Sequence, residues 1–475
     1  MDNQYYYKFI FLNLLLITGA SQSLSAHAET PLPDAQSVFS GSTYYSASDM
    51  ETGAEDGIPP LATHRASQQS IKSYLAQMAL AAKNYTPQIR EAKTSFQAAS
   101  ADTAQAKGAR LPQVDVGLQS NPVQFGSGEE VPRDQLTNGL SVNMTTPVFD
   151  WGYNSRNINS KELTAKAAEN YYRAQYENTS YQVCYQLAEL AKQKLIFQIS
   201  QAYVDRMERL VRMIGDISRV DAGRVGELTQ AQARMLQAET SRDDAESKIK
   251  DAQIALRKLT GKTSFIGLPT DPEWAINIEN PQKLLKAINR HPTIQQARNE
   301  AKSALEQAKA VKSGNLPKLS WVVSKTVPIN SGAYEEEWKT YLNVSWGIFR
   351  GGSANAQEEA AALRAEQAKE KITEQQIDLD NKVRSSLHNM QSMLSQAAQY
   401  HRLVQATDQV RKDFFEQWRQ LSTRTLLDVL TAESDYYNNQ VSEVTTRFNA
   451  YSAMFTGYAN AGLLNQWLGV YDSAS

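Results

Sequence analysis

Four short segments of the chain carry apolar side chains at every second position, with polar side chains between them. The segments span 114–119, 140–148, 319–324 and 341–348. This alternation is typical of β-strands that have one apolar and one polar face. The sequence therefore predicts two pairs of strands, one pair in each half of the chain. The apolar positions are Val114, Val116, Leu118, Leu140, Val142, Met144, Val148, Leu319, Trp321, Val323, Leu342, Val344, Trp346 and Ile348.

Each predicted strand pair is followed by a long segment without proline that favours helix. These segments run from Gly152 to about Met213 and from Gly352 to about Leu421. At about 1.5 Å per residue, each could span roughly 90–100 Å. A second helix follows each one. Its mostly apolar positions recur in alternating steps of three and four, which is typical of the contact seam of a coiled coil. The seams comprise Leu228, Ala231, Met235, Ala238, Arg242, Ala245, Ile249, Ala252 and Leu256, and Leu427, Leu430, Ser434, Tyr437, Val441, Val444, Phe448, Tyr451 and Phe455.

The two halves of the chain match at fixed points, which indicates an internal duplication. Pro87 and Pro112 are separated by the same distance as Pro292 and Pro317, and a leucine precedes the second proline of each pair. The segments VNMTTPVFDWG and LNVSWGIFRGG follow at corresponding places. Similar composition alone does not align Leu-Pro and Phe-x-x-Gly in this way. We therefore expect two repeats, each with the order helix, strand, strand, long helix and returning helix.

The N-terminal residues have the composition of an export signal. Lys8 precedes an apolar stretch at 9–17, and the small-residue site Ala26-His27-Ala28 follows. The stretch has roughly ten residues, whereas a membrane-spanning helix needs about 20. The expected organisation is a signal peptide at 1–28, a flexible extension at 29–66, a first repeat at 67–263, a linker at 264–284, a second repeat at 285–465 and a tail at 466–475.

The apolar face of the predicted strands must be shielded from water, and the sequence leaves two ways of doing so open. A soluble sheet would bury this face under helices or a second sheet, whereas a transmembrane sheet would turn it to lipid. Four strands cannot close a membrane barrel, because the smallest barrels have about eight and open edges leave backbone groups unpaired in lipid. Strands that cross a membrane must therefore be pooled from several chains, and three chains would supply twelve.

Composition and charge remove several classes of function. The chain has 49 Lys and Arg against 51 Asp and Glu, so we expect no broad basic face for nucleic acid. The single cysteine, Cys184, excludes an intrachain disulfide, and the five histidines show no ligand pair. The chain also lacks a nucleophile elbow and a complete phosphate-binding loop. We therefore expect no enzyme activity, cofactor or metal, and the mean hydropathy of -0.51 argues against a helical membrane protein.

Residues 67–465 resemble the TolC family of outer-membrane channel proteins. The most specific element is the segment STRTLLDVLTA at 422–432, which resembles the second helical tip of that family. PVFDWG and GIFRGG resemble its strand-to-helix junctions. The resemblance implies an α+β membrane protein, a homotrimer with a 12-stranded transmembrane β-barrel to which each chain gives four strands. The barrel would continue as a long periplasmic α-helical coiled-coil barrel. Outer-membrane lipid, a periplasmic adaptor and an inner-membrane ABC exporter or proton-driven pump are the implied partners.

The same resemblance places a periplasmic gate at the helical tips. Asp428 falls on a constriction acid and Arg424 on a linking arginine, whereas Thr431 and Thr229 occupy positions where some members carry further acids. A ring of three carboxylates would favour cations, and mutual repulsion would raise its pKa. The simpler interpretation stays open: Asp428 starts the returning helix and Arg424 is a solvated turn residue. The expected adaptor-docking residues are Gly223, Arg224, Val225, Gly226, Ser422 and Thr423.

Two functions of different classes follow from these patterns. The first is an outer-membrane exit duct that passes substrate from a pump and adaptor to the cell exterior. The segment TRTLLDVLTAE favours type I protein secretion, for example of a large adhesin, over small-molecule efflux. The second function is a structural coiled coil of the envelope. Extraction distinguishes them, because a barrel requires detergent and a coiled coil without a lipid anchor does not.

Overall fold

The computed structural model describes residues 65–119, 139–278, 280–328, 337–421 and 423–470. The predicted signal peptide, most of the predicted extension and Ser422 lie outside these residues. The chain separates into two units, 1–57 and 58–475, and every described residue belongs to the second unit.

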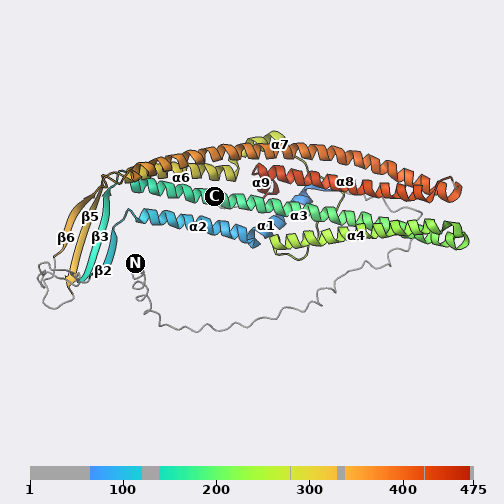
Figure 1. Cartoon of the computed structure of the whole chain (residues 1–475), viewed down its shortest axis with the longest axis horizontal. Coiled ribbons are helices and arrows are strands. Elements are labelled where there is room, and N and C mark those ends of the chain that lie inside the picture. The colour runs from blue at the N-terminus through green and yellow to red at the C-terminus, as the bar shows by residue number, and fades with distance from the viewer. Residues whose placement is uncertain (1–64, 120–138, 279, 329–336, 422, 471–475) are drawn as a thin grey trace, which may run out of the picture. The chain divides into compact units, whose positions relative to one another are not determined.

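The order helix, strand, strand, long helix and returning helix occurs twice, as the sequence predicts (Figure 1). The long helices have 68 and 64 residues, which confirms the lengths expected from the proline-free segments. The first half contains α2 (Pro87–Gly108), β2 (Gln113–Gln119), β3 (Gly139–Phe149), α3 (Tyr153–Val220) and α4 (Val225–Thr260). The second half contains α6 (Pro292–Gly314), β5 (Lys318–Pro328), β6 (Lys339–Ser345), α7 (Ser353–Glu416) and α8 (Leu426–Asn460).

Matching glycines and prolines begin the matching helices. Pro87 and Pro292 are the first residues of α2 and α6, a position where the missing N–H of proline costs nothing. Gly152 and Gly352 precede α3 and α7 with φ of 82° and 81°. Glycine adopts this left-handed conformation without a steric cost. The two halves therefore turn from strand to helix in the same way.

The four long strands form one antiparallel sheet in the order β2-β3-β5-β6. Directly opposed residues in such a sheet share a face. The register opposes Val116 to Val142, Met144 to Val323 and Leu319 to Val344, so the apolar positions of all four strands lie together. The other face carries a polar row of Asp115, Asn143, Ser324 and Lys339.

The two outer strands are shorter than the inner ones. β3 and β5 have 11 residues each, whereas β2 and β6 have 7 each. The expectation that the fourth strand extends to Ile348 is wrong, because β6 ends at Ser345. Its neighbour β5 starts pairing at Lys318, directly after Pro317, so residues beyond Ser345 have no strand partner within the described chain.

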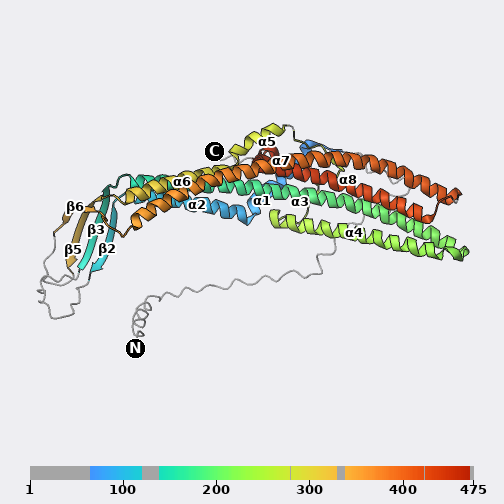
Figure 2. The ribbon, with the colours of Figure 1, turned by 45° about the horizontal axis from the view of Figure 1, so that its top comes forward.

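The helices pack side by side along their lengths (Figures 1 and 2). α3 contacts α2 and α4 as well as α6 and α8, and α7 contacts α6 and α8. The predicted seam of α4 is confirmed: Ala231, Ala238, Ala245 and Ala252, each seven residues apart, are buried. Most of the predicted α8 seam is buried or half-buried, whereas Leu427 at its start is exposed.

Smaller elements pack beside the middle of the long helices. They form a core in which the Trp274 ring stacks on Tyr451 at 5.6 Å and its backbone N–H donates to the Tyr451 hydroxyl at 2.9 Å. In the described chain, no helix is both long enough and apolar enough to cross a membrane. The smaller elements are β1 (Arg65–Ala66), α1 (Gln68–Tyr85), β4 (Glu273–Trp274), α5 (Pro281–Ala287) and α9 (Leu464–Leu468).

Candidate functional site

The first helical tip joins α3 to α4 through one 3₁₀ turn, Ala222–Arg224. The Asp221 carboxylate accepts a hydrogen bond from the Gly223 N–H at 3.0 Å. Arg224 lies 3.6 Å from Asp221 and 3.7 Å from Glu227. All three charged side chains are more than one third exposed. Ion pairs in such a setting contribute little to stability, because water competes for both charges.

The second tip leaves α7 through a π-helical turn, Gln417–Leu421, and four residues separate this turn from the start of α8. Arg424 Nε donates a hydrogen bond to Gln417 Oε1 at 3.1 Å. Its guanidinium also lies 4.1 Å from the centre of the Phe414 ring, which favours a cation–π interaction. Arg424 is therefore oriented against the end of α7 by residues of its own chain.

Asp428 forms a capping box with Thr425 at the start of α8. The Thr425 N–H and hydroxyl donate to Asp428 Oδ2 at 3.0 and 2.9 Å, and the Asp428 N–H donates to Thr425 Oγ1 at 3.2 Å. The hydrogen bond from the Thr425 N–H is the main cause of a lowered Asp428 pKa. A ring of three carboxylates would act in the opposite direction, but it needs three chains. Within one chain Asp428 caps a helix, and its role in a constriction stays a prediction.

The two threonines predicted near the gate are exposed and carry no charge. The Thr229 hydroxyl donates to the Val225 carbonyl at 3.2 Å, and the Thr431 hydroxyl donates to the Leu427 carbonyl at 2.8 Å. Both bonds stay within one helical turn. These two positions therefore offer hydroxyl groups at the tips.

The residues predicted to dock an adaptor belong to the turns themselves. Gly223, Val225, Gly226 and Thr423 are exposed, and Arg224 is half-buried. Ser422 lies outside the described residues. The described members are thus open to an approaching partner.

A buried ionic cluster near the second tip was missed by the sequence analysis. Glu433 of α8 contacts Arg206 of α3 at 2.7 Å and Arg411 of α7 at 3.4 Å. The side chains of Arg206 and Glu433 are 8% and 7% exposed. Asp408 adds a second carboxylate, 2.6 Å from Arg411. The only sequence signal is an acid beside the apolar seam of α8, because the partners come from two other helices.

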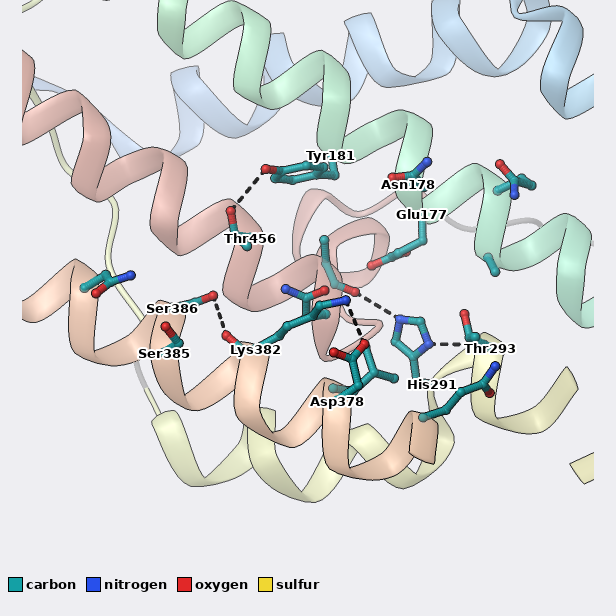
Figure 3. A pocket seen from close by; sticks show the side chains of 17 residues that line it. Glu177, Asn178, Tyr181, His291, Thr293, Asp378, Lys382, Ser385, Ser386 and Thr456 are labelled. Atoms are coloured by element: carbon teal, nitrogen blue, oxygen red, sulfur yellow. Dashed lines mark hydrogen bonds and ion pairs between the residues drawn. The ribbon is translucent and has the colours of Figure 1, made fainter. Parts of the chain in front are cut away.

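A polar cavity of about 730 Å³ lies near the N-terminus of α6 and the C-terminus of α8 (Figure 3). His291, which precedes α6, donates from Nε2 to the Ala459 carbonyl at 3.2 Å when neutral, and its Nδ1 accepts from the Thr293 N–H at 3.1 Å. Burial lowers the pKa of His291 and favours this neutral form. In the first half Thr86 precedes α2 in the same way, and its hydroxyl donates to the Leu259 carbonyl at 2.8 Å. The two halves therefore use a titratable and a non-titratable side chain at equivalent junctions.

Glu177 of α3 lines the same cavity (Figure 3). Burial raises its pKa to about 7, although its carboxylate accepts hydrogen bonds from the N–H groups of Leu464 and Asn465. Asp378 and Lys382 of α7 line it too and pair with each other at 2.7 Å. Among the described residues, no group of three or more His, Cys, Asp or Glu side chains could hold a metal ion.

The apolar face of the sheet has no cover in the described chain. Val116, Leu118, Leu342 and Val344 are 65%, 78%, 63% and 66% exposed. A sheet covered by the helices of its own chain, one of the two alternatives left open by the sequence, is therefore wrong for these residues. An apolar surface of this kind marks contact with a partner or a membrane.

Comparisons with known proteins agree with this architecture. A family model described as "Outer membrane efflux protein" matches residues 75–262 and 284–463. Outer membrane protein TolC of Escherichia coli (strain K12) is 23% identical over 420 residues, which cover 82% of this chain and 83% of the relative. Outer membrane efflux protein BepC of Brucella suis biovar 1 is 22% identical over 384 residues, with coverages of 78% and 81%. The crystal structure of the outer membrane protein VceC from Vibrio cholerae has the same fold, with a TM-score of 0.72, 19% identity and coverages of 82% and 96%.

Proposed function

Because the chain belongs to the outer membrane efflux protein family, we propose that it is the outer-membrane exit duct of a tripartite export system. The duct passes substrate from an inner-membrane pump, an ABC exporter or a proton-driven pump, through a periplasmic adaptor to the cell exterior. The protein is an outer-membrane protein with its helical part in the periplasm. The observation that carries the proposal is a sheet whose apolar face has no cover among the described residues and whose two outer strands each have only one strand partner among them.

The directions of the strands favour closure by identical copies. β2 and β6 run in opposite directions, because each of the three strand pairs between them is antiparallel. β6 of one copy can therefore pair with β2 of the next in the same antiparallel manner. Three copies give a homotrimer with a barrel of twelve strands, above the minimum of about eight. A duplicated ancestor explains why each copy carries two similar strand pairs.

Aromatic side chains support a transmembrane position for the sheet. Trp338 and Trp346 lie eight residues apart and flank β6, one directly before its first residue and the other directly after its last. At about 3.3 Å per residue they span roughly 26 Å, close to the apolar band of about 25 Å between the aromatic girdles of membrane barrels. At the helix end, the Trp151 and Trp346 indoles donate to the carbonyls of Pro317 at 2.9 Å and Asn315 at 3.1 Å.

The gate of this duct lies at the helical tips. Arg424 and Asp428 border the constriction, with Thr431 and Thr229 contributing hydroxyl groups. The adaptor docks on the turns at 223–226 and 422–423. Apart from Ser422, these residues lie at the ends of the paired helices, remote from the sheet, and this position supports the assignment.

The cargo we favour is protein, delivered by type I secretion. This choice rests on the segment TRTLLDVLTAE, whose capping box and arginine contacts give the second tip a defined geometry. Small-molecule efflux is the alternative. A strain that lacks the protein should stop releasing its secreted substrate, whereas increased drug sensitivity alone would favour efflux.

Single-channel recording in planar bilayers tests the duct and its gate together. The purified wild-type protein should form channels of low conductance, and the double variant Arg424→Ala/Asp428→Ala should form channels of higher conductance. Thr240→Ala, an exposed change in the middle of α4, is the matched control and should leave conductance unchanged. An unchanged conductance and cation preference in the double variant would remove these two residues from the gate. The absence of any channel would contradict the proposed duct.

A further inference from the structure

One segment of the chain carries basic side chains and no acidic ones. Residues 280–299 contain four Lys and Arg residues and no Asp or Glu, in a chain whose net charge is -2. Glu279 directly precedes the segment and lies outside the described residues. The segment forms α5, a 3₁₀ turn at Ile288–Arg290 and the start of α6. A local excess of one charge marks a surface that attracts a partner of the opposite charge.

Three of these bases lie on one face of the segment. Lys283, Lys286 and Arg290 follow one another in steps of three and four, a spacing that places helical side chains on the same side. All three are exposed. Leu284 and Ile288, which lie between them in the chain, are buried. The basic face, defined as Lys283, Lys286 and Arg290, therefore points away from the core.

The neighbouring helices do not neutralise the basic face. Gln376 of α7 donates to Asn289 Oδ1 at 3.2 Å, so Glu374, two positions earlier, lies on another side of α7. Among the described residues, no carboxylate forms an ion pair with a side chain of the basic face. Nearby acids pair instead with bases of α7: Glu300 with Lys371 at 3.3 Å, Asp378 with Lys382 at 2.7 Å and Asp380 with Arg384 at 2.7 Å.

The basic face is remote from both ends of the long helices. α5 lies beside α7 (Figure 2), and Asn289 contacts α7 at Gln376. At about 1.5 Å per residue, this contact is roughly 35 Å from the start of α7 near the strands and 60 Å from its end at the tip. A partner of this face is therefore neither membrane lipid at the sheet nor an adaptor at the tips.

We propose that the basic face binds the peptidoglycan of the cell wall, where the duct crosses it. Peptidoglycan lies in the periplasm, and its peptide stems carry free carboxylates, so its charge complements that of the three bases. Three copies of the chain present the face three times, and contacts that are weak alone reinforce one another when they are linked. The surface rests on the proposed function, because it needs the helices to lie in the periplasm.

The proposed duct leaves this face accessible to the wall. Leu284 of α5 packs in the same core as Trp274, so α5 belongs to the layer of smaller elements beside the long helices. In a duct this layer lies on the outer side of the helical wall, because the smaller elements of three copies would obstruct the interior. The basic face, which points away from that core, is then turned outward.

Co-sedimentation of the detergent-solubilised full-length protein with purified peptidoglycan sacculi tests this surface. The wild type should sediment with the sacculi at low ionic strength. It should stay in the supernatant at about 1 M NaCl, where charges are screened beyond about 3 Å. The triple variant Lys283→Gln/Lys286→Gln/Arg290→Gln should bind about tenfold more weakly, the effect expected from losing three exposed ion pairs in each chain.

Two controls separate this surface from general attraction between charges. Lys248→Gln/Lys250→Gln/Lys258→Gln removes the same charge from exposed positions of α4 and should bind like the wild type. Sacculi whose carboxylates have been converted to amides should no longer sediment the wild type, because they have lost the groups that the bases contact.

The outcomes separate this surface from the proposed function. Equal binding by the wild type and the basic-face variant, an equal loss in the α4 variant, undiminished binding to amidated sacculi, or no binding by the wild type would each overturn the surface. None of these results contradicts the duct. In planar bilayers the basic-face variant should form the same channels as the wild type, and a wild type that forms no channel would contradict the duct itself.

Discussion

The two helical tips connect equivalent pairs of helices by different means. The first turns in three residues, Ala222–Arg224, and its charged side chains pair only across exposed, local distances. The second combines a π-helical turn, a capping box at Thr425 and an arginine oriented by Gln417 and Phe414. The long helices determine where each tip begins and ends, but the side-chain contacts within the two turns differ.

The difference continues into the helices behind the tips. At its seam positions α4 buries Ala231 and Ala238, whose small side chains allow close approach to α3. On α8, Glu433 is buried between Arg206 and Arg411. The first pair is therefore stabilised near its tip by close packing, and the second also by paired charges that depend on one another.

Removing Glu433 should have the largest effect on stability. Glu433→Ala leaves Arg206 buried without its carboxylate, whereas Arg411 keeps Asp408, and breaking a buried pair in this way costs about 3–5 kcal/mol. Denaturant unfolding of the detergent-solubilised protein, followed by circular dichroism, measures the change. The first tip supplies the control: Glu227→Ala removes an exposed pair and should cost less than about 1 kcal/mol. Similar losses for both variants would show that the two tips do not differ in this way.

The stability of the protein should depend on pH through Glu177, which lines the cavity near His291 at the start of α6. Its pKa is about 7 in the folded protein and 4.5 in its ordinary state, so the folded state keeps a proton that the unfolded state releases between these values. Stability contributed by this group is therefore complete below about pH 4.5 and is lost as the pH rises through 7. The loss is at most about 3 kcal/mol.

Glu177→Gln tests this pH dependence, because the amide does not ionise. The variant should be more stable than the wild type at pH 8 and about equally stable at pH 4.5, as measured by thermal unfolding. His291 titrates in both proteins, so the difference between them isolates Glu177. Parallel stability curves for the two proteins across this range would rule out the effect.

The capping box should give a smaller effect. Thr425→Ala removes the side-chain acceptor for the Asp428 N–H and should destabilise the protein by about 1 kcal/mol. Thr229→Ala at the first tip removes only a hydroxyl that bonds within its own turn, so less than about 0.5 kcal/mol is expected. The same denaturant experiment compares them. A larger loss for Thr229→Ala would reverse the proposed contrast between the tips.

Local patterns predicted most of the fold. The alternation of apolar residues predicted the shared face of the four strands, because successive side chains of any strand point to opposite faces. The seven-residue spacing gave the alanine seam of α4 for the same reason. The end of β6 at Ser345 could not be predicted, because it depends on where its partner β5 begins.

The candidate sites depend more on contacts between distant segments. Thr425 and Asp428 lie three residues apart, so their capping box is a local feature, of which only the place of Asp428 at the start of the helix was predicted. The partners of Glu433 come from α3 and α7, and the stack of Trp274 on Tyr451 joins residues far apart in the chain. No local pattern specifies such pairs. The predicted constriction is formed by three copies of the chain, so its geometry cannot be derived from a single copy.

The mass of the protein extracted from membranes tests the account most directly, because the lipid-facing sheet requires pairing between copies. Light scattering of the purified protein, corrected for bound detergent, should give the mass of three chains, and extraction should fail without detergent. A single chain that stays in solution without detergent would contradict the shared barrel.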